Sequence, residues 1–337
     1  MGLYGDPHAT WGICLEAGLL EPLKVSDAER RLAALVAAHP SLGAVPDCRL
    51  VTEGWEAARS RVASQPYGAS EPLLRVLVDT DGSRLFVGAH HGAVDGLGLV
   101  AVAGAAAGLT VRARARGIGD RGARHGFLAS SVRRLGEALV HPPPRFPSGE
   151  PPVPEAVEDL GQHVLPHAHG GTAHLAHAVV AAYAARSVTR GDPLLLMGAS
   201  RRAEEELTPD RQTAYLRVRA TRSATVPDLR ARIAAAEPEP DFPETSARGI
   251  GPWVTHLLRG RLGATALLSN LGVLEAPGLR SVAMFPATSG PRAVAVGLAT
   301  AGGTTTLSLR TRRADFAPAD SARLLADIVD AYAAASG

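Results

Sequence analysis

The fold is decided by the stretch His90-His91-Gly92-Ala93-Val94-Asp95-Gly96, which ends one apolar run and is followed by another, Leu97-Gly98-Leu99-Val100. This order predicts a strand, then a turn that contains glycine, then a buried helix. Successive residues of a strand face opposite sides, so we expect His90 and His91 to have different roles. Histidine titrates near neutral pH and is therefore suited to general acid–base chemistry.

A predicted hairpin leads into this stretch. Leu73–Val78 is rich in strand formers, Asp81-Gly82 is a hairpin signal, and Arg84–Ala89 returns directly to the two histidines. The small and apolar residues from Leu97 to Leu109 then predict a buried helix, whose glycines allow close packing. We therefore expect the histidines at the end of a strand and just before a helix.

An earlier helix is predicted over about residues 27–38. Ser26-Asp27-Ala28-Glu29 forms a capping box at its start. The apolar side chains that follow share one helical face. The helix ends in His39-Pro40-Ser41-Leu42, an HPxL sequence.

The order of these motifs, HPxL and then a Pro-Leu-Leu-Arg strand, an Asp-Gly turn and HHxxxDG, resembles that of chloramphenicol acetyltransferase, of nonribosomal peptide synthetase condensation domains and of related acyltransferases. The resemblance implies an α/β protein with two-layer α+β lobes. It implies a pseudo-dimeric chloramphenicol acetyltransferase-like fold with an active-site tunnel between two lobes. The chain is shorter than most condensation domains and carries no carrier-protein module, which implies a free-standing member.

The resemblance also assigns roles within the motif. The second histidine of the family is the general base, which is His91 here, and His90 then packs and forms hydrogen bonds. The family's aspartate forms an ion pair that holds the loop, and its glycine leaves room for the thioester arm of the donor. These roles fall on Asp95 and Gly96. Many relatives pair the aspartate with an arginine after HPxL, but Gly43 stands there in this chain, so the sequence names no partner for Asp95.

The second half of the chain repeats the pattern without the histidines. A helix is predicted from about Thr172 to Arg186, and a buried strand over 194–199 ends in Ser200-Arg201-Arg202, which resembles a strand-to-arginine segment of the family. Residues 265–268 lead into Ser269-Asn270-Leu271-Gly272, which resembles an SNLG turn in the family's cleft. Ser269 and Asn270 are the predicted donors to the oxyanion of the thioester carbonyl. An Asx turn that closes the strand is the alternative interpretation, and both roles can coexist.

The remaining elements follow from local signals. We expect strands over 11–20, 214–220, 281–285, 293–298 and 304–311, and helices over about 225–236 and 318–335. The predicted domains are an N-terminal lobe over 1–140, a proline-rich crossover linker over 141–168 and a C-terminal lobe over 169–337. The linker is predicted because helices and sheet ladders do not persist through so many prolines.

Composition excludes several classes of function. The 337 residues carry a net charge of only +2, with 46% hydrophobic and 20% charged residues, so the charge gives no case for a nucleic-acid or membrane partner. Two cysteines are too few for a disulfide framework or a zinc site, and Met1–Asp6 lacks a basic leader and an apolar segment, which favours the cytoplasm.

Two further clusters leave functional and structural interpretations open. The arginine-rich stretch Arg112–Arg124 is suited to an acidic carrier protein or a coenzyme A phosphate, or it is a solvated surface, which we favour. Five histidines lie within fifteen residues, but no cysteine or suitably spaced carboxylate joins them, so we predict no metal site. They are His163, His167, His169, His174 and His177.

The sequence therefore predicts transfer of an acyl or aminoacyl group from a thioester to an amine or hydroxyl of a small-molecule acceptor, in natural-product biosynthesis. The co-substrate is acyl-CoA or a phosphopantetheine thioester on an acyl or peptidyl carrier protein, and no cofactor stays bound. One alternative is cyclisation, dehydration or epimerisation of a carrier-bound intermediate. Another is a catalytically degenerate protein that only binds or docks.

Overall fold

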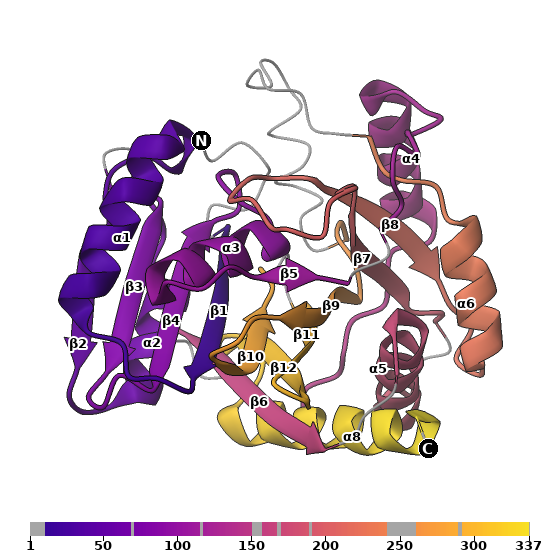
Figure 1. The fold of residues 1–337 in the computed structure, drawn as a ribbon. Helices are drawn as coiled ribbons and strands as arrows, with labels where there is room; N and C mark the ends of the chain where they lie inside the picture. Colours follow the sequence, from indigo (N-terminus) through magenta and orange to yellow (C-terminus); the bar gives the residue numbers. More distant parts are fainter. Residues whose placement is uncertain are drawn as a thin grey trace.

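The computed structural model describes residues 11–68, 71–114, 117–149, 157–166, 170–188, 191–240, 261–288 and 292–336. Two sheets lie at its centre, and helices cover them (Figure 1). The first sheet has the strand order β10 (Leu279–Phe285), β1 (Gly12–Leu19), β4 (Arg84–His90), β3 (Leu74–Asp79) and β2 (Cys48–Val51). The second has the order β6 (Glu158–Pro166), β12 (Thr304–Arg312), β11 (Val294–Ala301), β9 (Ala266–Glu275), β7 (Leu194–Ser200) and β8 (Thr213–Arg219), with β5 (Arg112–Ala113) paired to β9.

The described helices connect and flank these strands. They are α1 (Val25–Ala38), the short 3₁₀ helix η1 (Pro40–Leu42), α2 (Trp55–Ser64), α3 (Gly96–Ala107), α4 (Phe127–Val140), α5 (Thr172–Arg186), α6 (Val226–Ala235) and α8 (Pro318–Ser336). No helix among the described residues is both long enough and apolar enough to cross a membrane.

The first sheet is buried on both faces. The side chains of its strands alternate between these faces, and a different core cluster forms on each one. Leu15 of β1 packs in one core cluster with Leu32 of α1 and Leu99 of α3. Its neighbour Cys14 packs in another cluster with Trp55 of α2. All eight residues of β1 are consequently buried, which explains why its sequence alternates poorly.

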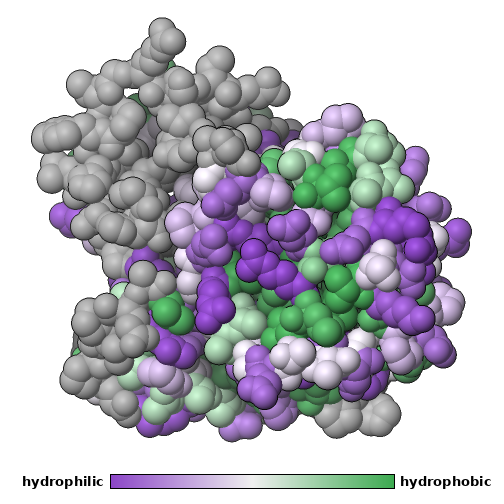
Figure 2. All heavy atoms as spheres, turned by 90° about the vertical axis from the view of Figure 1, so that its left-hand side faces the viewer, coloured by the Kyte–Doolittle hydropathy of each residue, from purple (hydrophilic) through white to green (hydrophobic). Residues whose placement is uncertain are grey.

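The second sheet has its own core, to which α5 and α8 contribute. Leu175 and Tyr183 of α5 and Leu324 of α8 are fully buried there, together with Leu307 of β12. These helices lie beside one another below the sheet in Figure 1. Viewed from the side of α1 and β2, the surface mixes polar and apolar side chains (Figure 2).

One strand of the second half completes the first sheet. β10 pairs antiparallel with β1, and it also packs against β11, where Gly297 permits a close approach. A Cβ at Gly297 would lie 1.9 Å from the carbonyl oxygen of Met284. The two halves of the chain are thus joined through β10, although residues 279–285 fall within the predicted C-terminal lobe.

Most of the predicted elements are confirmed, with the exceptions that follow. β6 occupies part of the predicted linker 141–168 and pairs along its whole length with β12, so that part of the linker prediction was wrong. Pro166 is the last residue of this strand, and the other prolines of the linker precede it. Residues 150–156 and 167–169 lie outside the described part, as do residues 1–10. The sequence analysis did not predict α2, α4, β2 or β5.

Candidate active site

Strand pairing fixes the backbone of the two histidines. The amide of His90 donates to the carbonyl of Leu73 at 2.9 Å, and the amide of His91 donates to the carbonyl of Trp11 at 2.8 Å. The chain then turns, and α3 begins at Gly96. The histidines therefore lie where β4 ends, between β1 and β3.

The two imidazoles lie on opposite sides of this strand end. His90 contacts the edge of Tyr67, with ring centroids 5.5 Å apart, and its Nδ1 accepts a hydrogen bond from the amide of Gly92 at 3.0 Å. His91 instead lines a cavity at the junction of the two halves of the chain. Only His91 is placed to reach a substrate in that cavity.

The hydrogen bonds of His91 fix its tautomer. Its Nδ1 lies 3.0 Å from the carbonyl oxygen of Val94, which only accepts, so Nδ1 carries the proton of the neutral ring. Its Nε2 accepts from the hydroxyl of Tyr215, at 2.5 Å. Burial lowers the pKa of His91, and the Val94 bond and the Asp95 charge oppose this effect without cancelling it. The ring is therefore neutral near pH 7, with its lone pair on Nε2.

Asp95 turns away from the cavity and meets Arg202. Its side chain is fully buried, and Nη1 of Arg202 lies 2.7 Å from one carboxylate oxygen and 3.0 Å from the other. Further donors are the amide of Gln212 at 2.7 Å and the hydroxyl of Thr213 at 2.8 Å. Arg202 is the partner that the sequence did not name, and it lies in the segment that resembles the family's strand-to-arginine sequence.

The same carboxylate caps α3, because it accepts from the amide of Gly98 at 2.8 Å. Burial alone would raise the pKa of Asp95, but the hydrogen bonds and charge of Arg202, with the amide donors, outweigh it and lower that pKa. Asp95 is thus a charged anchor that joins the loop, the helix and the second half of the chain.

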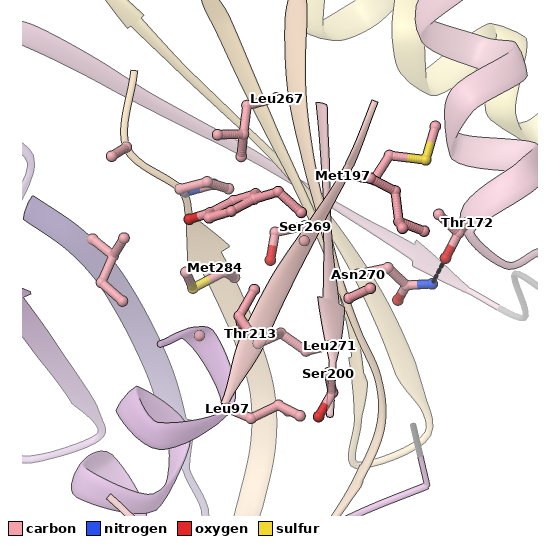
Figure 3. Close-up of a pocket in the computed structure, with 18 of the residues that line it drawn as sticks. Leu97, Thr172, Met197, Ser200, Thr213, Leu267, Ser269, Asn270, Leu271 and Met284 are labelled. Atoms are coloured by element: carbon pink, nitrogen blue, oxygen red, sulfur yellow. Dashed lines mark hydrogen bonds between the residues drawn. The ribbon is translucent and has the colours of Figure 1, made fainter. Parts of the chain in front are cut away.

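The cavity has a volume of about 160 Å³. Ile13, His91, Gly96 and Leu97 reach it from the first half, and β7, β8 and β9 of the second sheet supply most of the rest (Figure 3). The apolar side chains of the lining include Met197, Leu267 and Leu271 of the second sheet and Met284 of β10 in the first. Such a lining, with a few polar groups, is typical of sites for small molecules.

Ser269 and Asn270 both line this cavity, but they differ in their contacts. Asn270 donates to the hydroxyl of Thr172 at 3.1 Å and accepts from the amide of Gly272 at 2.9 Å. Ser269 forms no side-chain hydrogen bond with the described residues. Figure 3 shows Asn270 turned toward Thr172, whereas Ser269 lies nearer the middle of the lining residues. The side-chain amide of Asn270 is therefore already bonded, whereas the hydroxyl of Ser269 is available to a ligand.

The predicted turn at Ser269–Gly272 was wrong in one respect. β9 continues through it to Glu275, and the pairing with β11 shifts register at this point. Gly272 has a φ of +72°, a conformation that favours glycine, and the Asn270 side chain bonds to its amide. The Asx-type contact therefore forms inside a bulged strand and does not close one.

Gly96 allows α3 to begin close to β9. A Cβ on Gly96 would lie 3.0 Å from Cδ2 of Leu271 and 3.7 Å from Oγ of Ser269. The glycine thus keeps open the part of the cavity between the loop and the second sheet.

Sequence reasoning missed Tyr215, Thr213 and Thr172. The first two alternate on one face of β8, and the alternating pattern of that strand was the only signal that pointed to them. Nothing in the sequence indicates which face of β8 meets the histidine loop. That information comes only from how the two halves meet.

The predicted histidine cluster forms no metal site among the described residues, where no group of three His, Cys, Asp or Glu side chains is placed to hold an ion. His174 accepts from the amide of Gly171, and Nδ1 of His177 bonds to the carbonyl of Ala224. His167 and His169 lie outside the described residues.

Comparison with known proteins gives the fold. No family model and no curated protein sequence matches this chain. Trichothecene 15-O-acetyltransferase from Fusarium sporotrichioides matches with a TM-score of 0.62 and 12% identity, over 100% of this chain and 93% of that one. The first condensation domain of the calcium-dependent antibiotic synthetase, in complex with a substrate analogue, matches with a TM-score of 0.60 and 15% identity, over 98% and 94%.

A third solved structure carries ligands. A double mutant of the starter condensation domain of rhizomide synthetase, in complex with C8-CoA and Leu-SNAC, matches with a TM-score of 0.58 and 12% identity, over 99% of this chain and 90% of that one. The chain therefore has the chloramphenicol acetyltransferase-like fold that condensation domains share, as the sequence predicts.

Proposed function

We propose that this protein transfers an acyl group from a thioester to a hydroxyl or amine of a small-molecule acceptor, with His91 as the general base. The observation that carries the proposal is the state of His91. It faces the cavity as a neutral ring whose Nδ1 proton is bound to Val94, so that its lone pair is on Nε2. General base catalysis needs this arrangement, because a protonated imidazole has no lone pair to accept a proton.

The reaction needs no covalent intermediate on the protein. The acceptor's oxygen or nitrogen forms a bond to the thioester carbon as its proton moves toward His91. The resulting tetrahedral oxyanion then collapses, the carbon–sulfur bond breaks, and His91 gives the proton to the departing thiolate. Ser269 is the proposed donor to the oxyanion, because it lines the cavity and its hydroxyl forms no hydrogen bond with the described residues. Removal of one such donor from other enzymes costs about 3–4 kcal/mol.

Coenzyme A and a carrier protein present the same pantetheine thioester, so either is a suitable donor. The rhizomide synthetase domain of the same fold binds C8-CoA, which supports an acyl-CoA as the first donor to try. The apolar lining contributed by Met197, Leu267 and Leu271 favours an apolar acyl group. The neighbours named for trichothecene and antibiotic assembly support a setting in natural-product biosynthesis.

The test measures free thiol released from octanoyl-CoA in the presence of small alcohols and amines, with mass spectrometry of the acylated acceptor. We expect the wild-type protein to release thiol and form acyl product. His91→Ala should lose about 100-fold or more of this rate. His177→Ala is the matched control, because His177 bonds to Ala224 and does not line the cavity.

Three outcomes separate the alternatives. Full activity of His91→Ala contradicts the base assignment. Binding of octanoyl-CoA and of octanoyl carrier protein without thiol release from either favours the degenerate docking protein. Inversion of the α-carbon configuration of an aminoacyl group on a carrier protein, without thiol release, favours the epimerisation alternative.

A further inference from the structure

The hydroxyl of Tyr215 contacts His91 at the wall of the cavity. It lies 2.5 Å from Nε2 of His91, the two rings meet edge to face with centroids 6.3 Å apart, and both residues line the cavity. Tyr215 reaches His91 from β8, which is 124 residues away in the sequence. No motif of the sequence marks this tyrosine.

β8 holds Tyr215 firmly in this position. Gly198 of β7 is its direct pairing partner and leaves space on that face, while the amide of Glu239 donates to the carbonyl of Tyr215 at 2.8 Å on the other edge. Thr213, two residues earlier on the same face of the strand, donates to Asp95. One face of β8 therefore contacts both the aspartate and the second histidine of the motif.

The hydrogen-bond direction between Tyr215 and His91 follows from Val94. Because Nδ1 of His91 carries the proton that Val94 accepts, Nε2 is an acceptor and the tyrosine is the donor. The Nε2 lone pair, which is expected to take the proton of the acyl-accepting substrate, is thus already hydrogen-bonded to Tyr215. While this hydrogen bond is in place, a substrate in the cavity can pass a proton to Nε2 of His91 only through the oxygen of Tyr215.

We propose that Tyr215 is a catalytic residue that relays the proton between the nucleophile and His91; this inference rests on the proposed acyl transfer. As the nucleophile bonds to the thioester carbon, its proton moves to Oη of Tyr215 and the tyrosine's own proton moves to Nε2 of His91. When the carbon–sulfur bond breaks, Nε2 of His91 gives its proton back to Oη of Tyr215, and Tyr215 passes its other proton to the departing thiolate, which leaves as a thiol. Each group ends the cycle in its starting protonation state.

The protonation state of the tyrosine suits a concerted relay. Burial raises the pKa of Tyr215 to about 12, so a free tyrosinate does not accumulate at neutral pH. The two proton transfers must then occur together, because separate transfers would pass through a tyrosinate or a doubly protonated phenol. A concerted relay has two protons in flight, which a solvent isotope experiment detects.

The experiment compares Tyr215→Phe with the wild type in octanoyl-CoA transfer to the best acceptor. We expect kcat to fall about 100-fold or more while the KM for octanoyl-CoA changes less than about threefold. In the wild type, kcat plotted against the deuterium fraction of the solvent should curve as two transferred protons require. Tyr332→Phe is the control, since it removes another buried tyrosine hydroxyl outside the cavity.

The outcomes keep the two proposals distinct. Wild-type protein that releases no thiol contradicts acyl transfer and the relay together. If the wild-type protein is active and Tyr215→Phe is equally fast or faster, the relay alone is overturned. The tyrosine hydroxyl would then only occupy the site until a substrate displaces it. A linear isotope plot also overturns it.

A second variant covers the case in which Tyr215→Phe does not fold. Trifluorotyrosine placed at position 215 keeps the ring and the hydroxyl but lowers the phenol pKa. Because the relay needs a protonated tyrosine, the alkaline decline of kcat should move to lower pH in this protein. An unchanged alkaline profile contradicts the relay.

Discussion

Arg202 binds Asp95 across the junction between the two halves of the chain. The two side chains are 4% and 0% exposed, and Nη1 of Arg202 contacts both carboxylate oxygens. Nη2 of the same guanidinium donates to the carbonyl of Asp210 at 3.0 Å. The shape of the histidine loop in the first half thus depends on an arginine that follows β7 in the second.

Arg202→Met should destabilise the protein strongly. The substitution leaves the carboxylate of Asp95 buried without its counter-charge, and breaking a buried pair in this way costs about 3–5 kcal/mol. Urea unfolding measures the loss as a lower midpoint with an unchanged slope. Arg124→Ala is the matched control, because its partner is Glu237 and the two side chains are 78% and 35% exposed, so we expect less than about 1 kcal/mol. Equal stability of the two variants contradicts the anchoring role.

The pH dependence of the reaction should report the titration of His91. Burial sets its pKa below the ordinary value of 6.5, and only the neutral ring accepts a proton. The value of kcat/KM should therefore be constant near pH 7 and fall at lower pH, with a midpoint below 6.5. The measurement follows octanoyl-CoA transfer from pH 5 to pH 8, together with thermal unfolding at each pH. A midpoint above 7 in a protein that remains folded contradicts this prediction.

The sequence predicts the histidine loop, residues 90–96, but not the residues of the second half of the chain that contact it. The hairpin, the positions of His90 and His91 and the start of α3 follow from alternation, an Asp-Gly turn and an apolar run, all of which are local signals. The contacts of Arg202 and Tyr215 depend on how the second sheet meets that loop. Local patterns carry no information about such long-range pairing.

The same distinction explains the errors at β6 and β9. β6 follows a proline-rich stretch, and its pairing with the distant strand β12 overrides the irregularity predicted for the linker. At Asn270 the residue types of a turn are present. Pairing with β7 up to Ser269, and with β11 before and after the register shift, nevertheless keeps β9 extended, and the turn residues form a bulge. Tertiary pairing thus decided both cases against local preference.

Ser269→Ala and Asn270→Ala should have different effects: the first should lower the catalytic rate, and the second should lower the stability of the protein. Ser269 has no side-chain bond to the described residues, so its loss should lower kcat about 100-fold while the thermal midpoint stays within about 2 °C. Asn270 holds Thr172 and the amide of Gly272, so its loss should reduce stability by about 1–3 kcal/mol. Activity assays and thermal unfolding on both variants make the comparison. A fully active Ser269→Ala protein removes Ser269 as the oxyanion donor.

Gly96→Ala and Gly98→Ala add one methyl group each in the first turn of α3, with different consequences. At Gly96 the nearest atoms belong to side chains, with Cδ2 of Leu271 at 3.0 Å and Cε of Met284 at 3.4 Å, and these can shift. Stability should change by less than about 1 kcal/mol, since alanine also favours the helix. The methyl group nevertheless enters the cavity, so we expect kcat/KM for octanoyl-CoA to fall about tenfold or more.

At Gly98 the added methyl group meets backbone instead. It would lie 2.2 Å from the carbonyl oxygen of Asp210, in the segment that Arg202 holds against the loop. Backbone cannot rotate away as a side chain does, so Gly98→Ala should cost about 1–3 kcal/mol in the free energy of unfolding. Urea unfolding of both variants, with octanoyl-CoA kinetics on whichever folds, tests the pair. The two residues are only two positions apart in the same helix turn. A loss of activity at Gly96 with a loss of stability at Gly98 therefore locates the substrate on the Gly96 side, whereas parallel losses of stability and activity in both variants would show that Gly96 only packs.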